Sequence, residues 1–320
     1  MLVLSRAEVE SLIDLDRLRE AVAGAMADLS AGRVSMPSRI AAMVPERDAL
    51  LAAMPAYLPS SGALATKLVS LFPRNTDRPT HQAVIVVFDA ENGSPVALMD
   101  GEAITAARTA AGSALATDLL ARKDPYRLVV IGTGVQARAH LRAVSRVRKF
   151  GSICVAGRDV DKAQALAKEL GAGAYVDIQQ AVREADVVCA CTHSAEPVVR
   201  REWLKPGAHV NSVGYNTAGR EVDGATFRDA LVVVESRAAT LAAPPAGSND
   251  IAMAIAEGAM TREHVHAELG ELVSGTRPGR KDASQITLYK SVGVAVQDAA
   301  AAAMVLDAAR KAGVGRTIDL

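Results

Sequence analysis

The spacing of apolar positions changes character along the first third of the chain. From residue 6 to 31 apolar residues recur at nearly helical spacing, and Gly32 ends this predicted helix. Between residues 36 and 100 short alternating or apolar runs predict strands, at Arg39–Val44, Leu50–Met54, Ala65–Phe72, Gln82–Asp89 and Pro95–Met99. An Asn-Gly turn joins the last two. This part is expected to form a mostly antiparallel sheet.

Helices and strands alternate in the remainder. Residues 102–122, rich in Ala and Leu, predict a long helix that leads into a second domain. Near-continuous apolar runs then predict parallel strands covered on both faces, at Leu128–Ile131, Ile153–Ala156, Ala174–Val176, Val187–Cys191, His209–Val213 and Leu231–Val234. A last long helix is expected at about residues 286–312. The pattern therefore predicts an α/β protein, in which a Rossmann-type doubly wound parallel sheet follows an α+β region.

Composition and charge narrow the class of partner. The 320 residues suit two domains, and 36 basic residues balance 36 acidic ones, which argues against nucleic acid as the main partner. Residues 1–16 do not fit a signal peptide, and no apolar run approaches the ~18 residues of a membrane span. The three cysteines lie in apolar stretches and predict reduced thiols rather than a metal site. A cytoplasmic protein without metal is expected.

One glycine turn carries the strongest local signal. Gly132-Thr133-Gly134-Val135-Gln136-Ala137 has the form G-x-G-x-x-A, follows an apolar strand and opens a helix. Gly132 permits the tight turn, Gly134 lets the backbone approach a pyrophosphate, and Ala137 keeps helix and strand close. The free N–H groups of the helix N-terminus then favour the anion. The turn predicts a dinucleotide site that includes Val135 and Gln136.

The end of the second predicted strand bears on cofactor choice. It reads Gly157-Arg158-Asp159, with Lys162 one helical turn further on. A carboxylate at this position binds a ribose 2′-hydroxyl, whereas an arginine accommodates a 2′-phosphate. Asp159 is either the ribose acceptor or a helix cap. Arg158 favours NADP(H), and NAD(H) remains the alternative.

A second set of motifs lies mostly outside the dinucleotide site. Together with the glycine turn, these motifs closely resemble the ornithine cyclodeaminase/mu-crystallin family, over almost the whole chain and in order: Met36-Pro37-Ser38-Arg39, Thr66-Lys67-Leu68-Val69-Ser70, Thr80-His81-Gln82-Ala83, Met99-Asp100-Gly101, Ala107-Arg108-Thr109-Ala110-Ala111 and Leu288-Tyr289-Lys290-Ser291-Val292-Gly293. The resemblance implies a homodimer with a split domain for substrate binding and dimerisation, at residues 1–115 completed by 290–320. A Rossmann domain at 116–289 would be inserted into it.

The resemblance also implies an activity and roles for individual residues. Members move hydride between nicotinamide and the α-carbon of a small amino or imino acid. Arg39 and Arg108 would clamp the substrate carboxylate in bidentate fashion, and Lys67 would act as proton donor or electrostatic stabiliser. Ser291 would lie at the substrate pocket. The cofactor contacts would come from the glycine turn, from Arg108 and from Thr80, His81, Thr109, Gly157, Arg158, Lys162, Thr192 and Val213.

One departure from the family pattern separates two reactions. Cyclodeaminases of the family carry an aspartate at the position of Asn216, and asparagine cannot be a general base. Glu221 or Asp223 could substitute, although their local pattern indicates helix capping. We therefore expect an NAD(P)H-dependent imine reductase or amino-acid dehydrogenase, with Lys67, Arg108 and Asn216 at the catalytic centre. A cyclodeaminase that retains its NAD and a non-catalytic binding protein are the alternatives.

Overall fold

The computed structural model describes residues 1–216 and 218–319, and it divides the chain into two compact units. Unit 1 comprises Met1–Arg108 and Gly293–Leu320, and unit 2 comprises Thr109–Val292. The divisions thus lie near residues 108 and 292, whereas the sequence placed them near 115 and 289. Each unit is described below by itself.

Unit 1 is built on a mixed sheet with the strand order β15-β1-β6-β5-β4-β3-β2. The β1–β6 pair is parallel and the other pairs are antiparallel. Five strands match the predicted runs closely, whereas β1 and β15 were not predicted, because two or three residues carry no readable alternation. The bounds are β1 Leu2–Leu4, β2 Ile40–Val44, β3 Ala49–Leu58, β4 Ala63–Leu71, β5 His81–Phe88, β6 Pro95–Asp100 and β15 Arg316–Thr317.

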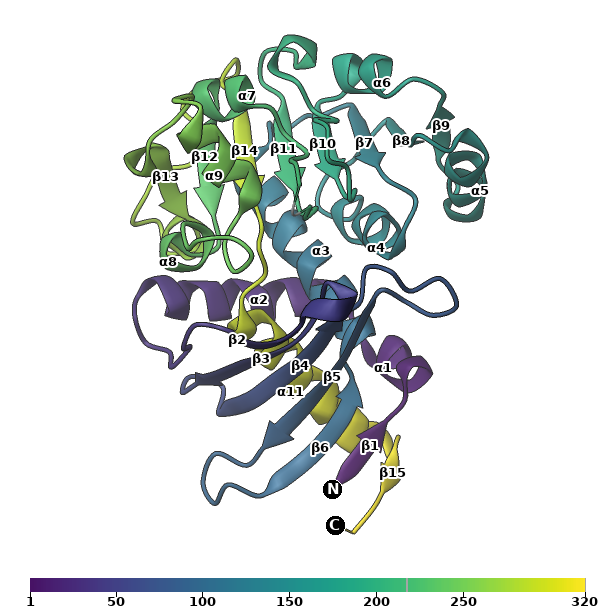
Figure 1. Cartoon of the computed structure of the whole chain (residues 1–320), viewed down its shortest axis with the longest axis vertical. Coiled ribbons are helices and arrows are strands. Elements are labelled where there is room, and N and C mark those ends of the chain that lie inside the picture. Colours follow the sequence, from purple (N-terminus) through teal and green to yellow (C-terminus); the bar gives the residue numbers. More distant parts are fainter. Residues whose placement is uncertain (217, 320) are drawn as a thin grey trace. The chain divides into compact units, whose positions relative to one another are not determined.

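Helices cover one face of this sheet. The prediction of a single helix over residues 6–31 is wrong: α1 (Arg6–Leu12) and α2 (Leu15–Ser30) are separate helices, because Asp14 caps the N-terminus of α2. The long helix α11 (Ala295–Ala312) packs against α2, β3 and β4 and crosses the strands in Figure 1. A 3₁₀ turn at Pro45–Arg47 follows β2.

Strand alternation sorts the side chains of this sheet onto two faces. In the antiparallel register Lys67 lies opposite Met54 on β3 and Ile85 on β5, and all three side chains are buried. The other face is less covered. Three of its apolar side chains are substantially exposed, namely Ile40, Leu51 and Val84. A lysine on the buried face of an otherwise apolar sheet is the first unusual feature of unit 1.

Unit 2 contains an eight-stranded, entirely parallel sheet with the order β13-β12-β14-β11-β10-β7-β8-β9. Its bounds are β7 Arg127–Ile131, β8 Ser152–Ala156, β9 Gly173–Tyr175, β10 Val187–Ala190, β11 His209–Ser212, β12 Leu231–Val234, β13 Val265–Glu268 and β14 Thr287–Lys290. The chain reverses its direction of travel across the sheet between β7 and β10, where open α/β sheets place their ligands. The predicted doubly wound parallel sheet is confirmed.

Two apolar cores cover the two faces of the parallel sheet. On β7, Val129 and Ile131 belong to one core, whereas Leu128 and Val130 belong to the other. The first core takes residues from α6 (Ile178–Glu184), α7 (Gly224–Asp229) and α9 (Asn249–Ala256), and the second from α3 (Gly101–Leu120), α4 (Val135–Val144) and α5 (Val160–Leu170). Shorter helical segments are α8 Arg237–Thr240, α10 Leu269–Val273 and 3₁₀ turns at Arg201–Trp203 and Arg262–His264.

The last predicted helix begins later than expected. Residues 287–290 do not start a helix but form β14, which pairs with both β11 and β12 and is completely buried. Gly293, at φ 73°, then turns the chain, and α11 starts at Ala295. The four-residue strand was overlooked because its apolar run merges in sequence with the Ala-rich helix.

Candidate active site

Lys67 projects from the middle of β4 onto the buried face of the unit 1 sheet. Its side chain is 3% exposed, and its Nζ lies 2.8 Å from Oδ2 of Asp298 on α11. Burial lowers the pKa of Lys67 to about 8; Asp298 opposes this effect, whereas Arg108 and Arg39 add to it. The sequence-based expectation of a lysine that acts as an acid near neutral pH thus acquires a physical basis.

Arg108 is held by the same helix. Its Nε donates to Oδ1 of Asp298 at 2.8 Å, and its Nη1 donates to Oε1 of Gln297 at 3.1 Å. Asp298 is buried, which by itself raises its pKa, but Arg108 and Lys67 hold the pKa below its ordinary value. Asp298 is therefore an ionised carboxylate that bridges two cations.

Arg39 lies near Arg108, because both side chains approach Gly293. Its Nη2 donates to the Gly293 carbonyl oxygen at 2.8 Å. A Cβ on Gly293 would lie 2.8 Å from Nη2 of Arg108, so a glycine is needed both for the positive φ and for the approach of this guanidinium. We call Arg39, Lys67 and Arg108, with Asp298, the cation cluster. It contains three cations and one carboxylate.

His81 and Thr80 lie at the start of β5. Burial, together with Lys67 and Arg108, lowers the pKa of His81 to about 4, so its imidazole is neutral at physiological pH. Thr80 is exposed, and its carbonyl oxygen accepts from the Phe72 amide. His81 therefore lies within electrostatic reach of the cation cluster, whereas the structure gives the Thr80 side chain no recorded contact with it.

The glycine turn of unit 2 has the geometry that a dinucleotide requires. Gly132 has φ 125°, and a Cβ there would lie 2.7 Å from the Cys191 carbonyl oxygen, so no other residue fits. Gly134 is the N-cap of α4, makes no side-chain cap, and has open space where a Cβ would stand. The first-turn amides of α4 are thus available to an anion. Val135 is exposed and Gln136 half-buried on this turn.

The tip of β8 presents Arg158 rather than a carboxylate. Asp159 caps α5 by accepting from the Lys162 amide at 3.0 Å, and its Oδ2 lies 3.1 Å from Lys162 Nζ. Of the two roles open to Asp159, the helix cap is the one observed. Arg158 is exposed, and Gly157 beside it is buried against Thr133.

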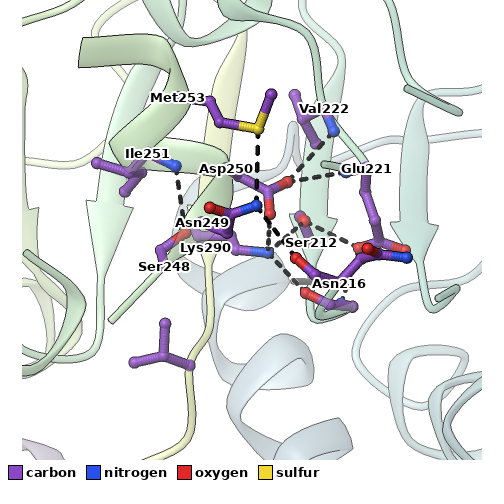
Figure 2. Close-up of polar contacts among 12 residues, drawn as sticks. Ser212, Asn216, Glu221, Val222, Ser248, Asn249, Asp250, Ile251, Met253 and Lys290 are labelled. Atoms are coloured by element: carbon purple, nitrogen blue, oxygen red, sulfur yellow. Dashed lines mark hydrogen bonds and ion pairs between the residues drawn. The ribbon is translucent and has the colours of Figure 1, made fainter. Parts of the chain in front are cut away.

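The carboxyl ends of β10 and β11 are tied together by Glu221 (Figure 2). Oε1 of Glu221 accepts from the amide and hydroxyl of Thr192, and Oε2 accepts from Ser212 Oγ and from the Gly214 amide. Burial raises the pKa of Glu221, opposed by Lys290. Val213 lies between these tied positions, just after β11.

Asn216 and Ser291 both belong to unit 2, and residues of that unit hold each of them by hydrogen bonds. Asn216 is half-buried; its Nδ2 donates to the His193 carbonyl oxygen, and its Oδ1 accepts from the Ala218 amide. Ser291 is buried, and its hydroxyl donates to Oε1 of Glu235 at 2.7 Å. Thr109 is buried in the middle of α3.

Several site residues were missed from the sequence. Asp298, Gln297, Glu235 and Asp250 were not singled out, and Lys290 was quoted only as part of a motif, although all five are buried and all but Asp250 lie in apolar stretches. That was the available signal. Asp223 does cap α7, as expected, but Glu221 does not cap a helix: it holds two strand ends.

Two further observations concern the described residues alone. Residues 1–216 and 218–319 contain no group of three or more His, Cys, Asp or Glu arranged to hold a metal ion. In the same residues, no helix combines the length and the apolar character that a membrane crossing needs.

Known proteins share both the sequence and the fold. Ketimine reductase mu-crystallin of Mus musculus is 38% identical over 281 residues, which cover 86% of each chain. The structure of Thermococcus litoralis Δ1-pyrroline-2-carboxylate reductase in complex with NADH and L-proline matches with a TM-score of 0.94 and 38% identity, covering 99% of this chain and 100% of that one. An archaeal alanine dehydrogenase dimer with bound NAD matches at 0.92 and 32%, covering 100% and 99%.

The family assignment rests on almost the full length of the chain. The sequence profile described as "Ornithine cyclodeaminase/mu-crystallin family" matches residues 1–313. The matched region contains both the cation cluster and the glycine turn. The chain belongs to the ornithine cyclodeaminase/mu-crystallin family.

Proposed function

We propose that the protein is an NAD(P)H-dependent reductase of a small imino acid, either a cyclic ketimine carboxylate or the imine of a small 2-oxo acid. The observation that carries this proposal is the cation cluster on the buried face of the unit 1 sheet. Lys67 and Arg108 are buried and Arg39 is half-buried beside one carboxylate, an arrangement that is costly unless an anionic ligand completes the balance. The relatives named above, which act on imino or amino acids, support the same class of substrate.

The substrate carboxylate is the anion that fits. Arg39 and Arg108 both converge on Gly293, and planar guanidinium groups bind a carboxylate through paired hydrogen bonds. Asp298 and Gln297 fix the orientation of Arg108, so little side-chain freedom is lost when the anion binds. In this role Arg39 and Arg108 set the position of the imine carbon.

Lys67 then controls the proton on the imine nitrogen. Reduction of C=N adds a hydride to carbon and a proton to nitrogen, and Lys67 Nζ is the proton source at the cluster. With its pKa lowered to about 8, Lys67 is mainly protonated at neutral pH yet gives up its proton readily. Asp298 keeps the ammonium in place between turnovers.

The residues of the glycine turn and of the β8 tip fit a nicotinamide dinucleotide. When bound, this cofactor supplies the hydride. Gly132, Gly134 and the α4 amides would hold its pyrophosphate. Because Asp159 is committed to capping α5, Arg158 determines the charge at the ribose position, and we propose a preference for NADP(H) over NAD(H).

A small imine panel tests the proposal. Oxidation of NADPH and of NADH is followed at 340 nm against Δ1-pyrroline-2-carboxylate, Δ1-piperideine-2-carboxylate, and pyruvate, glyoxylate or oxaloacetate with ammonia. We expect turnover of at least one imine, its loss in Lys67→Ala, and its retention in Lys311→Ala, an exposed lysine of α11. Silence across the panel, with ammonia release from ornithine or lysine at catalytic NAD, would establish the cyclodeaminase instead.

We also propose that the protein is a homodimer that uses the less covered face of the unit 1 sheet. Ile40, Leu51 and Val84 lie on this face of β2, β3 and β5 with 41–70% of their surface exposed, and clustered exposed apolar side chains of this kind mark protein–protein contacts. Leu51→Glu is expected to halve the mass measured by light scattering. The control is Val176→Glu, an exposed apolar residue of unit 2. Equal masses for wild type and Leu51→Glu would refute this interface.

A further inference from the structure

Three charged side chains are buried together in unit 2. Glu221, Asp250 and Lys290 are each at most 2% exposed, and Figure 2 shows them converging at the carboxyl ends of β11 and β14. Lys290 Nζ lies 3.1 Å from Asp250 Oδ2 and donates to Ser212 Oγ and to the Gly214 carbonyl oxygen. We call Glu221, Asp250 and Lys290 the acidic cluster.

The hydrogen bonds of Glu221 favour its ionised form and oppose the burial that raises its pKa. Two of its four donors, the amides of Thr192 and Gly214, can only donate. The Ser212 hydroxyl accepts from Lys290 and so directs its own hydrogen to Glu221. The Thr192 hydroxyl likewise accepts from the Ser194 amide and directs its hydrogen to Glu221. Four donors therefore face the two oxygens of Glu221, an arrangement that suits a carboxylate.

The acidic cluster therefore carries a net negative charge. Asp250 accepts from the amides of Glu221 and Val222 and faces the Lys290 ammonium, so it is ionised as well. The three donor hydrogens of Lys290 have three acceptors. Two carboxylates and one ammonium leave one negative charge in excess. The neighbouring ion pair of Arg220 with Glu257 is balanced within itself.

This charge lies at the edge of the sheet where the cofactor is expected. Glu221 binds the backbone directly after β10 and β11, and in doubly wound sheets the ligand occupies the crevice outside these carboxyl ends. A Cβ on Gly214 would lie 2.2 Å from both Glu221 Cδ and the Thr192 carbonyl oxygen, so the carboxylate is packed tightly against this edge.

We propose that the acidic cluster is an electrostatic element that favours the oxidised over the reduced nicotinamide, and so promotes hydride donation. The inference rests on the proposed function. The nicotinamide ring is neutral in the reduced cofactor and positively charged in the oxidised one. A fixed negative charge at this edge of the sheet would favour the positively charged oxidised ring over the neutral reduced one. The roles of Glu221 and Asp250 are thus electrostatic and positional, without contact to the reacting atoms.

Equilibrium binding of the two redox states tests the inference without turnover. Dissociation constants for NADPH and NADP⁺, and for NADH and NAD⁺, are measured by calorimetry on the full chain and on Glu221→Gln, which keeps the shape and removes the charge. We expect Glu221→Gln to weaken binding of the oxidised cofactor relative to the reduced one by roughly tenfold, the order of a partly screened interaction between two unit charges. Asp250→Asn is expected to shift the ratio in the same direction.

The control variant loosens the same loop without changing its charge. Asn249 Nδ2 donates to the carbonyl oxygens of Asn216 and Gly219, so Asn249→Ala removes two restraints and is expected to leave the ratio unchanged. If Glu221→Gln and Asp250→Asn weaken both redox states equally, the acidic cluster is merely structural and the inference is overturned. If the unmodified protein binds none of the four cofactors, the proposed function itself fails.

Discussion

The two units each bury a cluster of charged side chains, and the two clusters have opposite imbalances. In the cation cluster of unit 1, Lys67 and Arg108 share the carboxylate of Asp298, and Arg39 binds the Gly293 carbonyl oxygen beside them. The acidic cluster of unit 2 sets two carboxylates against one ammonium. Buried charges are normally matched, because an uncompensated one is costly. An imbalance that the fold tolerates points to a ligand of the opposite sign. The first cluster suits a substrate anion, and the second suits a nicotinamide that becomes a cation.

The largest effect is expected from Lys67→Ala, which removes the proton donor from the cation cluster. We expect kcat for the best imine to fall by about 10²–10⁴-fold, the usual contribution of a general acid. The dissociation constant for NADPH should stay unchanged, since the acidic cluster and the glycine turn are intact. Steady-state kinetics and calorimetry measure the two quantities. A parallel loss of NADPH binding would contradict the proposal that the cation cluster binds the substrate and unit 2 binds the cofactor.

Gly293→Ala is expected to disturb the cation cluster by changing the backbone beside it. The added Cβ would meet the Arg108 guanidinium, and alanine is strained at φ 73°. We expect KM for the imine to rise by roughly ten- to a hundredfold, the cost of one charge-assisted hydrogen bond, with a smaller change in kcat. Gly313→Ala, at φ 64° in open space, controls for backbone strain alone. An unchanged KM would mean that Arg108 does not bind the substrate carboxylate.

Arg158→Ala tests the cofactor side with a smaller expected effect. Loss of the guanidinium should raise KM for NADPH about tenfold and leave KM for NADH nearly constant, because only NADPH carries the 2′-phosphate. The comparison uses one imine and both cofactors. Equal effects on both cofactors would show that Arg158 does not distinguish the 2′-phosphate from the 2′-hydroxyl.

The smallest predicted effect is a shift of the pH profile in Asp298→Asn. In the proposed reaction Lys67 acts as an acid, so kcat/KM should decline as pH rises above the Lys67 pKa of about 8. Asp298 raises the pKa of Lys67, so removing its charge lowers that pKa and should move the basic limb to lower pH. Profiles of wild type and Asp298→Asn, taken with saturating cofactor, measure the displacement. A limb that stays in place would mean that another group titrates.

Much of the fold was predictable because the period of the apolar pattern is a local property. The parallel strands of unit 2 are short apolar runs between helices, and the glycine turn lies where G-x-G-x-x-A placed it. The failures are local as well. Asp14 divides one periodic segment into two helices, and β14 was concealed by the Ala-rich helix after it. Short strands such as β1 and β15 depend on partners distant in sequence.

The candidate site was only half predictable, because single residues were readable and their pairings were not. Lys67 and Arg108 could be singled out as cations in apolar stretches. The counter-ion Asp298 is 231 positions beyond Lys67 in an unremarkable helical segment. Glu221 was interpreted as a helix cap, because its four donors come from residues that meet only when β10 and β11 pair.

The split of unit 1 between the two ends of the chain has a consequence for biosynthesis. Lys67 and Arg108 are made early, whereas Asp298 belongs to a helix that leaves the ribosome almost last. During translation Lys67 on the apolar face of the first sheet, and Arg108 on α3, therefore lack their counter-ion, and the sheet lacks the helix α11 that covers it. Unit 2 is continuous and its elements are complete by then, so it can fold first, as domains tend to do in order of synthesis. The nascent first sheet is the segment on which a holding chaperone would act.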